Sequence, residues 1–252
     1  MSIIVKSDHQ IDLMRKAGRL AAAARSLAGQ MVEPGVSTQT INKEIFHFIR
    51  KSGGQPTFLG YGGFPASACI SINDQVIHGI PGTRRLAEGD IVSIDVGATL
   101  NGYVGDCAAT FPCGSCSEEA MRLIAVTRQS FFEGIKNARA GCRVSDISAA
   151  VQAHAEANGY SVVRDYVGHG VGAQMHEEPE VPNFGRPGHG PRLVKGMTIA
   201  VEPMINAGGW EIKVLPDGWT VLTADGSLSA HYENSILITD GEAEILTFAD
   251  DI

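Results

Sequence analysis

The sequence predicts an α+β fold made of two similar halves, each with two helices and following strands. Helical and strand-like patterns alternate twice along the 252 residues. Three positions also recur at an offset of 106 residues (141 − 35, 147 − 41, 159 − 53): Gly35 with Gly141, Ile41 with Ile147, and Gly53 with Gly159. We therefore expect one domain over residues 1–252, with pseudo-two-fold halves of about 1–112 and 113–252. Four helices should cover one face of a curved sheet.

The first half opens with a long helical pattern. Ser7 and Gln10 form a capping box, and Pro34 and Gly35 follow the last apolar position. Small or apolar residues stand at helical spacing between them, at Ile11, Met14, Ala17, Ala21, Ala24, Ala28 and Met31. A second helix is expected from about Thr38 to Lys51, before Gly53. Strands are expected over residues 68–72 and 91–98.

The second half repeats this order. A long helix is expected from Ser117 to about Ala138, and Gly141 and Gly159 frame the repeat of the second helix. Strand-like runs follow over residues 197–203 and 231–238. Between the halves, Cys113 and Cys116 form a lone CxxC without a second pair at zinc-finger spacing. We interpret it as a turn between a strand and a helix rather than a zinc or redox site.

Composition and charge narrow the possible partners. The formal net charge of −8 and the absence of a Lys/Arg cluster argue against nucleic-acid binding. No apolar run is long enough to span a bilayer or to act as a targeting segment, so no membrane partner and a cytoplasmic location are expected. Five cysteines in a chain of this length fit reduced thiols. Nothing in the sequence demands more than a monomer.

A predicted hairpin brings two carboxylates to one face of the sheet. Asn101 and Gly102 are a two-residue turn signal, so the residue numbers of cross-strand partners should sum to 203. Asp95 then lies opposite Ala108, and Asp106 shares its face at a diagonal of roughly 7 Å. Two carboxylates at that spacing can reach a pair of metal ions about 3.5 to 4 Å apart.

A wider set of residues matches the ligand demand of two divalent ions. Glu202 and Glu233 each stand in an apolar strand-like run, and Gly168 and Gly170 flank His169, leaving its imidazole accessible. The candidate ligands are Asp95, Asp106, His169, Glu202 and Glu233. This oxygen-rich set suits Mn, Fe(II), Co or Zn without choosing among them. Like charges so close should raise one another's pKa values, so metal binding should release protons.

Three side chains are candidates for the chemistry of a hydrolase. A water shared by two such ions is acidic enough to attack a carbonyl near neutral pH. Glu202 is the candidate base that takes the proton of this water, and His176 is the candidate donor to the developing oxyanion. His78 is the candidate hydrogen-bonding partner of the substrate amide near the leaving group.

A spaced set of motifs resembles the methionine aminopeptidase family over essentially the whole chain. The segments are CISIN at 69–73, HGIP at 78–81, SIDV at 93–96, GD at 105–106, GHG at 168–170, MHEEP at 175–179, IAVEP at 199–203 and YE at 232–233. The resemblance implies the pita-bread fold, two divalent ions and removal of the initiator Met from nascent chains whose second residue is small. The resemblance does not decide whether the protein acts on these chains at the ribosome.

The resemblance also implies roles for individual residues. Asp95 and Asp106 would hold both ions, Glu233 would bridge them, and His169 and Glu202 would complete one site. Tyr61, Phe64, Cys69 and Trp219 would form the pocket for the Met side chain. Phe58, Phe64 and Met175 stand where the family commonly has Cys, Tyr and an aromatic residue, so pocket width and inhibitor preference are open.

Two further expectations concern the branch of the family. The interval from His176 to Glu202 (202 − 176 = 26) leaves no room for a helical insertion, so the type I branch is implied. The short segment before the first helix suggests that the chain has neither a zinc-finger extension nor the N-terminal domain of Xaa-Pro peptidases. The alternatives are an Xaa-Pro dipeptidase or aminopeptidase of the same fold and a catalytically weak binding paralogue.

Overall fold

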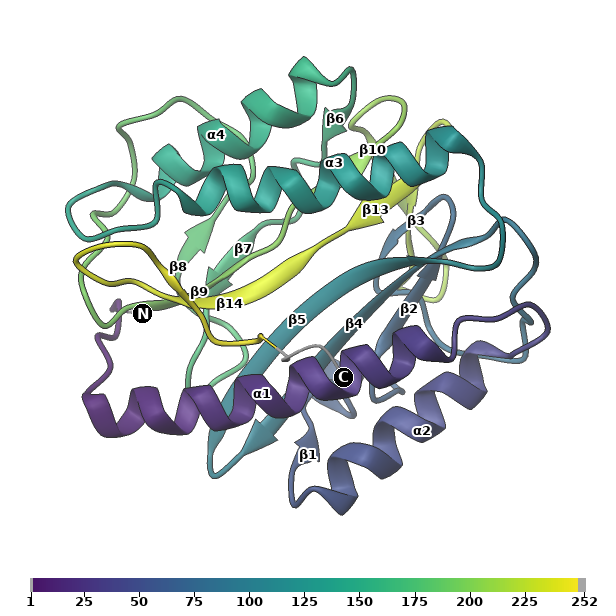
Figure 1. The fold of residues 1–252 in the computed structure, drawn as a ribbon, viewed down its shortest axis with the longest axis horizontal. Coiled ribbons are helices and arrows are strands. Elements are labelled where there is room, and N and C mark those ends of the chain that lie inside the picture. Colours follow the sequence, from purple (N-terminus) through teal and green to yellow (C-terminus); the bar gives the residue numbers. More distant parts are fainter. Residues whose placement is uncertain (1, 249–252) are drawn as a thin grey trace.

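The computed structural model describes residues 2–248, which form a twisted antiparallel sheet with helices on one of its faces (Figure 1). The helices are α1 (Asp8–Gln30), α2 (Thr38–Lys51), α3 (Glu118–Ile135) and α4 (Val144–Ala157). In Figure 1, α1 and α2 cross the lower part of the view and α3 and α4 cross its upper part. No helix within residues 2–248 is both long and apolar enough to cross a membrane.

The helices begin where their capping residues predict. The Ser7 hydroxyl accepts a hydrogen bond from the Gln10 amide, and the Gln10 side chain accepts one from the Ser7 amide, which confirms the capping box. Ser37 caps α2, whose bounds match the predicted ones. Ser117 caps α3, but this helix ends at Ile135, three residues before the predicted end. There the Ala138 N–H donates to the Ile135 carbonyl, a tight turn that directs the chain toward the sheet.

The repeat at an offset of 106 residues extends through whole elements. The helices α2 and α4 have 14 residues each, and both ends of α4 follow those of α2 by 106 (144 − 38, 157 − 51). The backbone φ angles of Gly35 and Gly141 are 91° and 94°, and those of Gly53 and Gly159 are 82° and 84°. Positive φ favours glycine, so the repeated glycines are required by the turns that frame each helix.

Within residues 2–248, the main sheet has nine strands in the order β1-β4-β5-β14-β9-β7-β8, with β2 beside β4 and β15 beside β14. Its strands are β1 (Gln55–Pro56), β2 (Cys69–Ile72), β4 (Ile91–Leu100), β5 (Tyr103–Pro112), β7 (Gly168–Gly170), β8 (Glu177–Val181), β9 (Thr198–Val201), β14 (Glu233–Leu237) and β15 (Glu244–Ile245). Two three-stranded sheets hold β3 (Gln75–Ile77), β6 (Ser161–Val162), β10 (Met204–Asn206), β11 (Ile212–Val214), β12 (Val221–Thr223) and β13 (Ser229–His231).

The β4–β5 hairpin has the predicted register. Asn101 and Gly102 form the turn with φ angles of 52° and 81°, and Asp95 pairs with Ala108. The first strand continues to Leu100, two residues beyond the predicted end. The earlier strand β2 begins at Cys69 rather than at residue 68.

The two faces of the sheet have opposite character. Val92, Ile94 and Val96 of β4 pack in one core cluster with residues of α1 and α2. Ile199 and Ile236 of β9 and β14 pack in another cluster with residues of α3 and α4. Because side chains alternate along a strand, Asp95, Asp106 and Glu233 lie on the face away from the helices. The predicted arrangement of four helices on one face is therefore confirmed, and the acidic residues lie on the other.

Candidate active site

One cavity of about 320 Å³ lies on the face of the sheet away from the helices. Every residue predicted to take part in catalysis, metal binding or specificity lines it: Phe58, Tyr61, Phe64, Cys69, His78, Asp95, Asp106, His169, Met175, His176, Glu202, Trp219 and Glu233. These residues come from both halves of the chain, and the sheet register brings them together.

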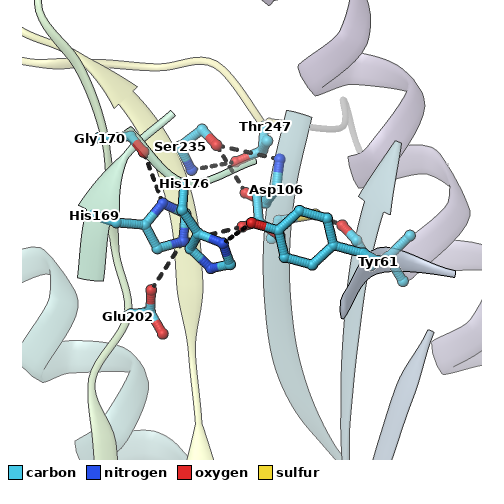
Figure 2. Close-up of polar contacts among 10 residues, drawn as sticks. Tyr61, Asp106, His169, Gly170, His176, Glu202, Ser235 and Thr247 are labelled. Atoms are coloured by element: carbon cyan, nitrogen blue, oxygen red, sulfur yellow. Dashed lines mark hydrogen bonds and ion pairs between the residues drawn. The ribbon is translucent and has the colours of Figure 1, made fainter. Parts of the chain in front are cut away.

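Neighbouring strands place the carboxylates in adjacent positions. Asp95 on β4 pairs with Ala108 on β5, and Ala108 in turn pairs with Glu233 on β14. Asp106 lies two residues from Ala108 and points to the same face. The Ser235 hydroxyl fixes the Asp106 backbone by donating to its carbonyl and accepting from its amide (Figure 2). The carboxylate positions thus follow from strand pairing.

Glu202 and Glu233 lie at strand ends, contrary to the continuous strands predicted over residues 197–203 and 231–238. Glu202 follows β9, and Glu233 begins β14. Pro203 has no N–H for the ladder, so the chain leaves the main sheet there and enters the smaller sheet at Met204. The Glu202 carbonyl accepts a hydrogen bond from the side-chain amide of Asn183. The break exposes the Glu202 carboxylate to the cavity.

His169 stands among the carboxylates in a form suited to binding a metal. Its Nε2 lies 3.6 Å from Asp106 Oδ2 and 3.5 Å from Glu202 Oε1 (Figure 2). One ligand atom each from Asp106, His169 and Glu233 lie within 4.8 Å of one another. The Nδ1–H donates to the Gly170 carbonyl at 2.8 Å, which leaves the lone pair of a neutral ring on Nε2. The imidazole therefore presents an acceptor atom to the acidic cluster.

The glycines beside His169 also have a structural use that was not predicted. A Cβ at Gly168 would lie 2.4 Å from the Ala200 carbonyl oxygen, and one at Gly170 would lie 2.3 Å from the Glu178 carbonyl oxygen. His169 itself is buried, with 8% of its surface exposed. The glycines thus let β8 and β9 approach β7 closely, while the imidazole faces the cavity that it lines.

Asp106 and Glu233 are buried and Asp95 and Glu202 are partly buried, and burial raises the pKa values of all four carboxyl groups. Burial is the largest cause for all four, and repulsion from other carboxylates adds to it for Asp95, Glu202 and Glu233. The pKa of Asp106 rises from 3.8 to about 7. Arg25 lowers the pKa of Asp95 and so opposes part of the increase. The cluster therefore holds protons at neutral pH unless positive charge enters it.

The donor set fits divalent metal ions. One buried oxygen each of Asp95, Asp106 and Glu233 has no hydrogen-bond partner among the described residues. Unpaired buried carboxylate oxygens are costly, and a cation that they coordinate removes this cost. Oxygen ligands with one imidazole suit Mn, Fe(II), Co or Zn better than Ca or a closed structural zinc site.

Two further histidines line the cavity. His78 has a positive φ of 57°, and its ring meets those of Tyr166 and Trp219 edge-on. Burial lowers the pKa of His78 to about 4, and burial also lowers the pKa of His176. The Tyr61 hydroxyl lies 2.7 Å from His176 Nδ1 (Figure 2). Both imidazoles are therefore neutral at pH 7 and able to donate one hydrogen bond each.

Apolar side chains form the rest of the cavity wall. Phe58, Phe64, Cys69 and Met175 are buried, and the Phe64 ring meets that of Trp219 edge-on at 5.2 Å. Tyr61 differs from them, because 45% of its surface is exposed. Tyr61 lies at the rim of the cavity, and its hydroxyl is within hydrogen-bond distance of His176 Nδ1. It therefore contacts a candidate catalytic residue in addition to forming part of the pocket wall.

The sequence prediction missed Tyr166 and Ser235. Tyr166 lines the cavity and packs on His78, and Ser235 holds the Asp106 backbone. Tyr166 precedes the GHG segment by two residues, so its closeness to a candidate ligand was the available signal. Ser235 stands two residues after Glu233 on the same strand face, which the alternation of strand side chains could have revealed.

The CxxC segment lies away from this cavity and forms the predicted turn. Cys113 follows β5, Gly114 has a φ of 64°, and α3 begins after Ser117. All five cysteines are free. The Cys116 thiol donates to the Asp90 carbonyl at 3.3 Å.

Comparisons with known proteins point to a metallopeptidase, in agreement with the donor set of the site. Residues 12–240 match the model of metallopeptidase family M24. The chain is 55% identical to the methionine aminopeptidase of Clostridium perfringens over 245 residues, which are 97% of this chain and 98% of that protein. The crystal structure of methionine aminopeptidase from Rickettsia prowazekii superposes with a TM-score of 0.97 at 42% identity, covering 98% of this chain and 100% of that one.

A prolidase has the same fold at greater distance. The structure of the prolidase from Pyrococcus horikoshii OT3 gives a TM-score of 0.78 at 22% identity and covers 98% of this chain but 64% of that one. This likeness concerns the fold alone. Together with the matched family model and the identity over nearly the full length, the site shows that the chain belongs to metallopeptidase family M24 and, within it, to the methionine aminopeptidases.

Proposed function

We propose that this chain hydrolyses the peptide bond after an N-terminal methionine, removing the initiator residue from nascent proteins whose second residue is small. The observation that carries this proposal is the composition of one cavity. An apolar chamber bounded by Phe58, Phe64 and Trp219 adjoins the carboxylates and His169 within about 320 Å³. Such a chamber accommodates one unbranched apolar side chain, and the aromatic and sulfur-containing walls suit a thioether.

We propose that two divalent ions are held by Asp95, Asp106, His169, Glu202 and Glu233. Support comes from the unpaired buried oxygens, the lone pair on His169 Nε2 and the close group of ligand atoms. In such a site, divalent ions acidify a water and polarise a carbonyl oxygen. The four carboxylates offset four positive charges, so the filled site is close to neutral.

The side chains of the cavity then divide the remaining work. Glu202 borders the cavity beside His169, and we assign it the role of accepting the proton of the attacking water. His176 donates a hydrogen bond to the oxyanion that develops on the scissile carbonyl. His78 binds the substrate amide near the leaving group. Neutral histidines suit both tasks because each keeps one N–H donor.

The Tyr61 hydroxyl sets which nitrogen of His176 carries the proton. When Tyr61 donates to Nδ1, the ring proton lies on Nε2, and this nitrogen can then donate to the oxyanion. A hydrogen bond between neutral groups contributes about 1 kcal/mol, so Tyr61→Phe should lower kcat roughly three- to tenfold with little change in KM.

Steady-state kinetics of metal-loaded Tyr61→Phe check this prediction. Tyr160→Phe is the matched control, because Tyr160 is buried in a different core cluster and does not line the cavity. A rise in KM at unchanged kcat would show that Tyr61 only binds substrate, as a wall of the pocket.

The assigned activity has a direct test. The metal-loaded protein should release free methionine from Met-Ala and Met-Gly peptides, and a chelator should abolish the reaction. Leu-Ala and Xaa-Pro peptides are the controls. Cleavage of Xaa-Pro peptides without action on Met-Ala would replace the assignment by a proline-directed peptidase. Metal binding without cleavage of any of these peptides would favour a binding paralogue.

We further propose that the chain acts as a monomeric type I enzyme, with residues 1–252 forming one catalytic domain. The short segment between His176 and β9 contains the strand β8 and no helix, which supports the type I branch. Five free thiols suit a reducing compartment, so the cytoplasm is the proposed location. Substrates would be nascent chains, met at the ribosome or after release.

A further inference from the structure

A partly buried cation lies behind the candidate metal site. Arg25 stands on α1, which packs on β4 and β5, the strands that carry Asp95 and Asp106. Its Nη1 donates to the Glu233 carbonyl at 3.1 Å, to Asn234 Oδ1 at 3.2 Å and to the Ala108 carbonyl at 3.4 Å. Ala108 and Glu233 are the paired residues that join β5 to β14. The guanidinium therefore lies on the helix face of the sheet, directly behind the row of acidic residues.

The acceptors of Arg25 carry no charge. Within residues 2–248, no carboxylate forms an ion pair with this guanidinium, and its hydrogen bonds end on carbonyl and amide oxygens. Arg25 also lines a second cavity, whose described lining residues include another arginine, Arg128, and no carboxylate. Placing an unpaired cation partly out of water costs free energy unless negative charge lies near. The acidic cluster lies across the sheet, and Arg25 lowers the pKa of Asp95 in it.

We propose that Arg25 is a positioning residue of the metal site, whose fixed positive charge offsets the repulsion among the carboxylates when no metal is bound and thereby weakens metal affinity. This inference rests on the proposed function, because it assigns metal to the cluster. The sign follows from the net charges. An empty cluster of four carboxylates keeps part of its negative charge even with the protons that it holds, and this charge attracts Arg25, whereas a cluster that holds two divalent ions is close to neutral. The charge of Arg25 therefore stabilises the empty site more than the filled one.

Three variants separate this charge from the hydrogen bonds of Arg25. Arg25→Gln keeps donors and removes the charge, whereas Arg25→Lys keeps the charge and loses the planar fork. Arg19→Gln is the matched control, since Arg19 is an exposed residue of the same helix. Chelator-treated proteins are compared by thermal unfolding and by calorimetric titration with Mn(II), at fixed pH and at two salt concentrations.

The charge model predicts a specific pattern. Arg25→Gln should unfold at a temperature about 5 °C lower without metal and should bind Mn(II) about fivefold more tightly, with a smaller difference at high salt. Arg25→Lys and Arg19→Gln should stay close to the wild type. Equal behaviour of Arg25→Gln and Arg25→Lys would overturn the proposal, because hydrogen bonding alone would then explain the residue. Weaker Mn(II) binding by Arg25→Gln would overturn it as well.

A second comparison distinguishes this inference from the proposed metal binding. The destabilisation caused by Arg25→Gln in the metal-free protein should shrink when Asp106→Asn is also present, because one negative charge has been removed. An unchanged destabilisation in the Asp106→Asn background would refute the role of the charge. If neither the wild type nor any variant bound Mn(II), the metal assignment would fail, while this double-mutant cycle would still decide the role of Arg25.

Discussion

Asp106→Asn is expected to abolish peptide cleavage and at the same time to stabilise the metal-free protein. Asp106 belongs to the closest group of potential ligand atoms, and its Oδ1 is buried without a partner. Loss of one proposed metal ligand would remove several kcal/mol of charge stabilisation, so kcat/KM should fall by about 10³-fold or more. The neutral amide also relieves repulsion in the empty cluster. The unfolding temperature without metal should then rise by roughly 2 to 4 °C for each kcal/mol of repulsion that is relieved.

The stabilising effect of Asp106→Asn should depend on pH in a defined direction. The pKa of Asp106 is raised from 3.8 to about 7 on folding. Its protonated form is therefore preferred in the folded state, and this contribution to stability is present below about pH 4 and lost as the pH rises through 7. The difference in unfolding temperature between variant and wild type should be small near pH 4 and should increase up to about pH 7.

The variant and the wild type are compared by the difference between their unfolding temperatures, because the buried histidines change stability with pH in the opposite direction. Burial lowers the pKa values of His78 and His169 to about 4, so these groups favour the folded state at higher pH. Their effect is common to both proteins and largely cancels. Chelator-treated samples followed by circular dichroism provide the measurement. A variant that unfolds at a lower temperature than the wild type at pH 8 would contradict the expected repulsion.

His176→Ala is expected to retain metal and lose most of its turnover. Removing one oxyanion donor typically costs about 2.7 to 4 kcal/mol, or about 10² to 10³ in kcat. Nε2 of His169, and not His176, lies within 4 Å of the acidic oxygens. Metal content by elemental analysis should therefore equal that of the wild type, and KM should change little.

Two variants serve as references for His176→Ala. His176→Gln keeps a donor and should recover part of the activity, whereas His47→Ala, at an exposed position of α2, should behave as the wild type. Loss of metal in His176→Ala would make this residue a ligand. A large rise in KM at constant kcat would make it a substrate-binding group that does not act on the transition state.

The sequence was sufficient for the features that depend on local rules. The capping box of Ser7 and Gln10 predicted the start of α1, and the Asn101–Gly102 turn predicted the hairpin register that places Asp95 and Asp106 on one face. The repeat at 106 residues predicted the position of α4 in register with α2. The pita-bread fold and the candidate site residues came from motif spacing together with the family resemblance.

Features that depend on contacts distant in sequence could not be predicted. The distribution of apolar residues over 197–203 and 231–238 resembles one strand each, but Pro203 transfers the chain to a second sheet. The glycines beside His169 are needed by the carbonyls of Ala200 and Glu178, which only the folded sheet brings near. The same holds for Arg25, whose position on α1 gives no sign of the metal site behind the sheet.

The pairing of Ala108 with Glu233 joins residues 125 positions apart in the chain (233 − 108). Asp95 and Asp106 belong to a hairpin that can close early and locally, but His169, Glu202 and Glu233 are synthesised later, and β14 is nearly the last strand. Such long-range pairing forms slowly compared with a hairpin. The protein should therefore acquire its metal affinity in the final stage of folding. The rate of metal uptake during refolding then reports when the native structure is complete.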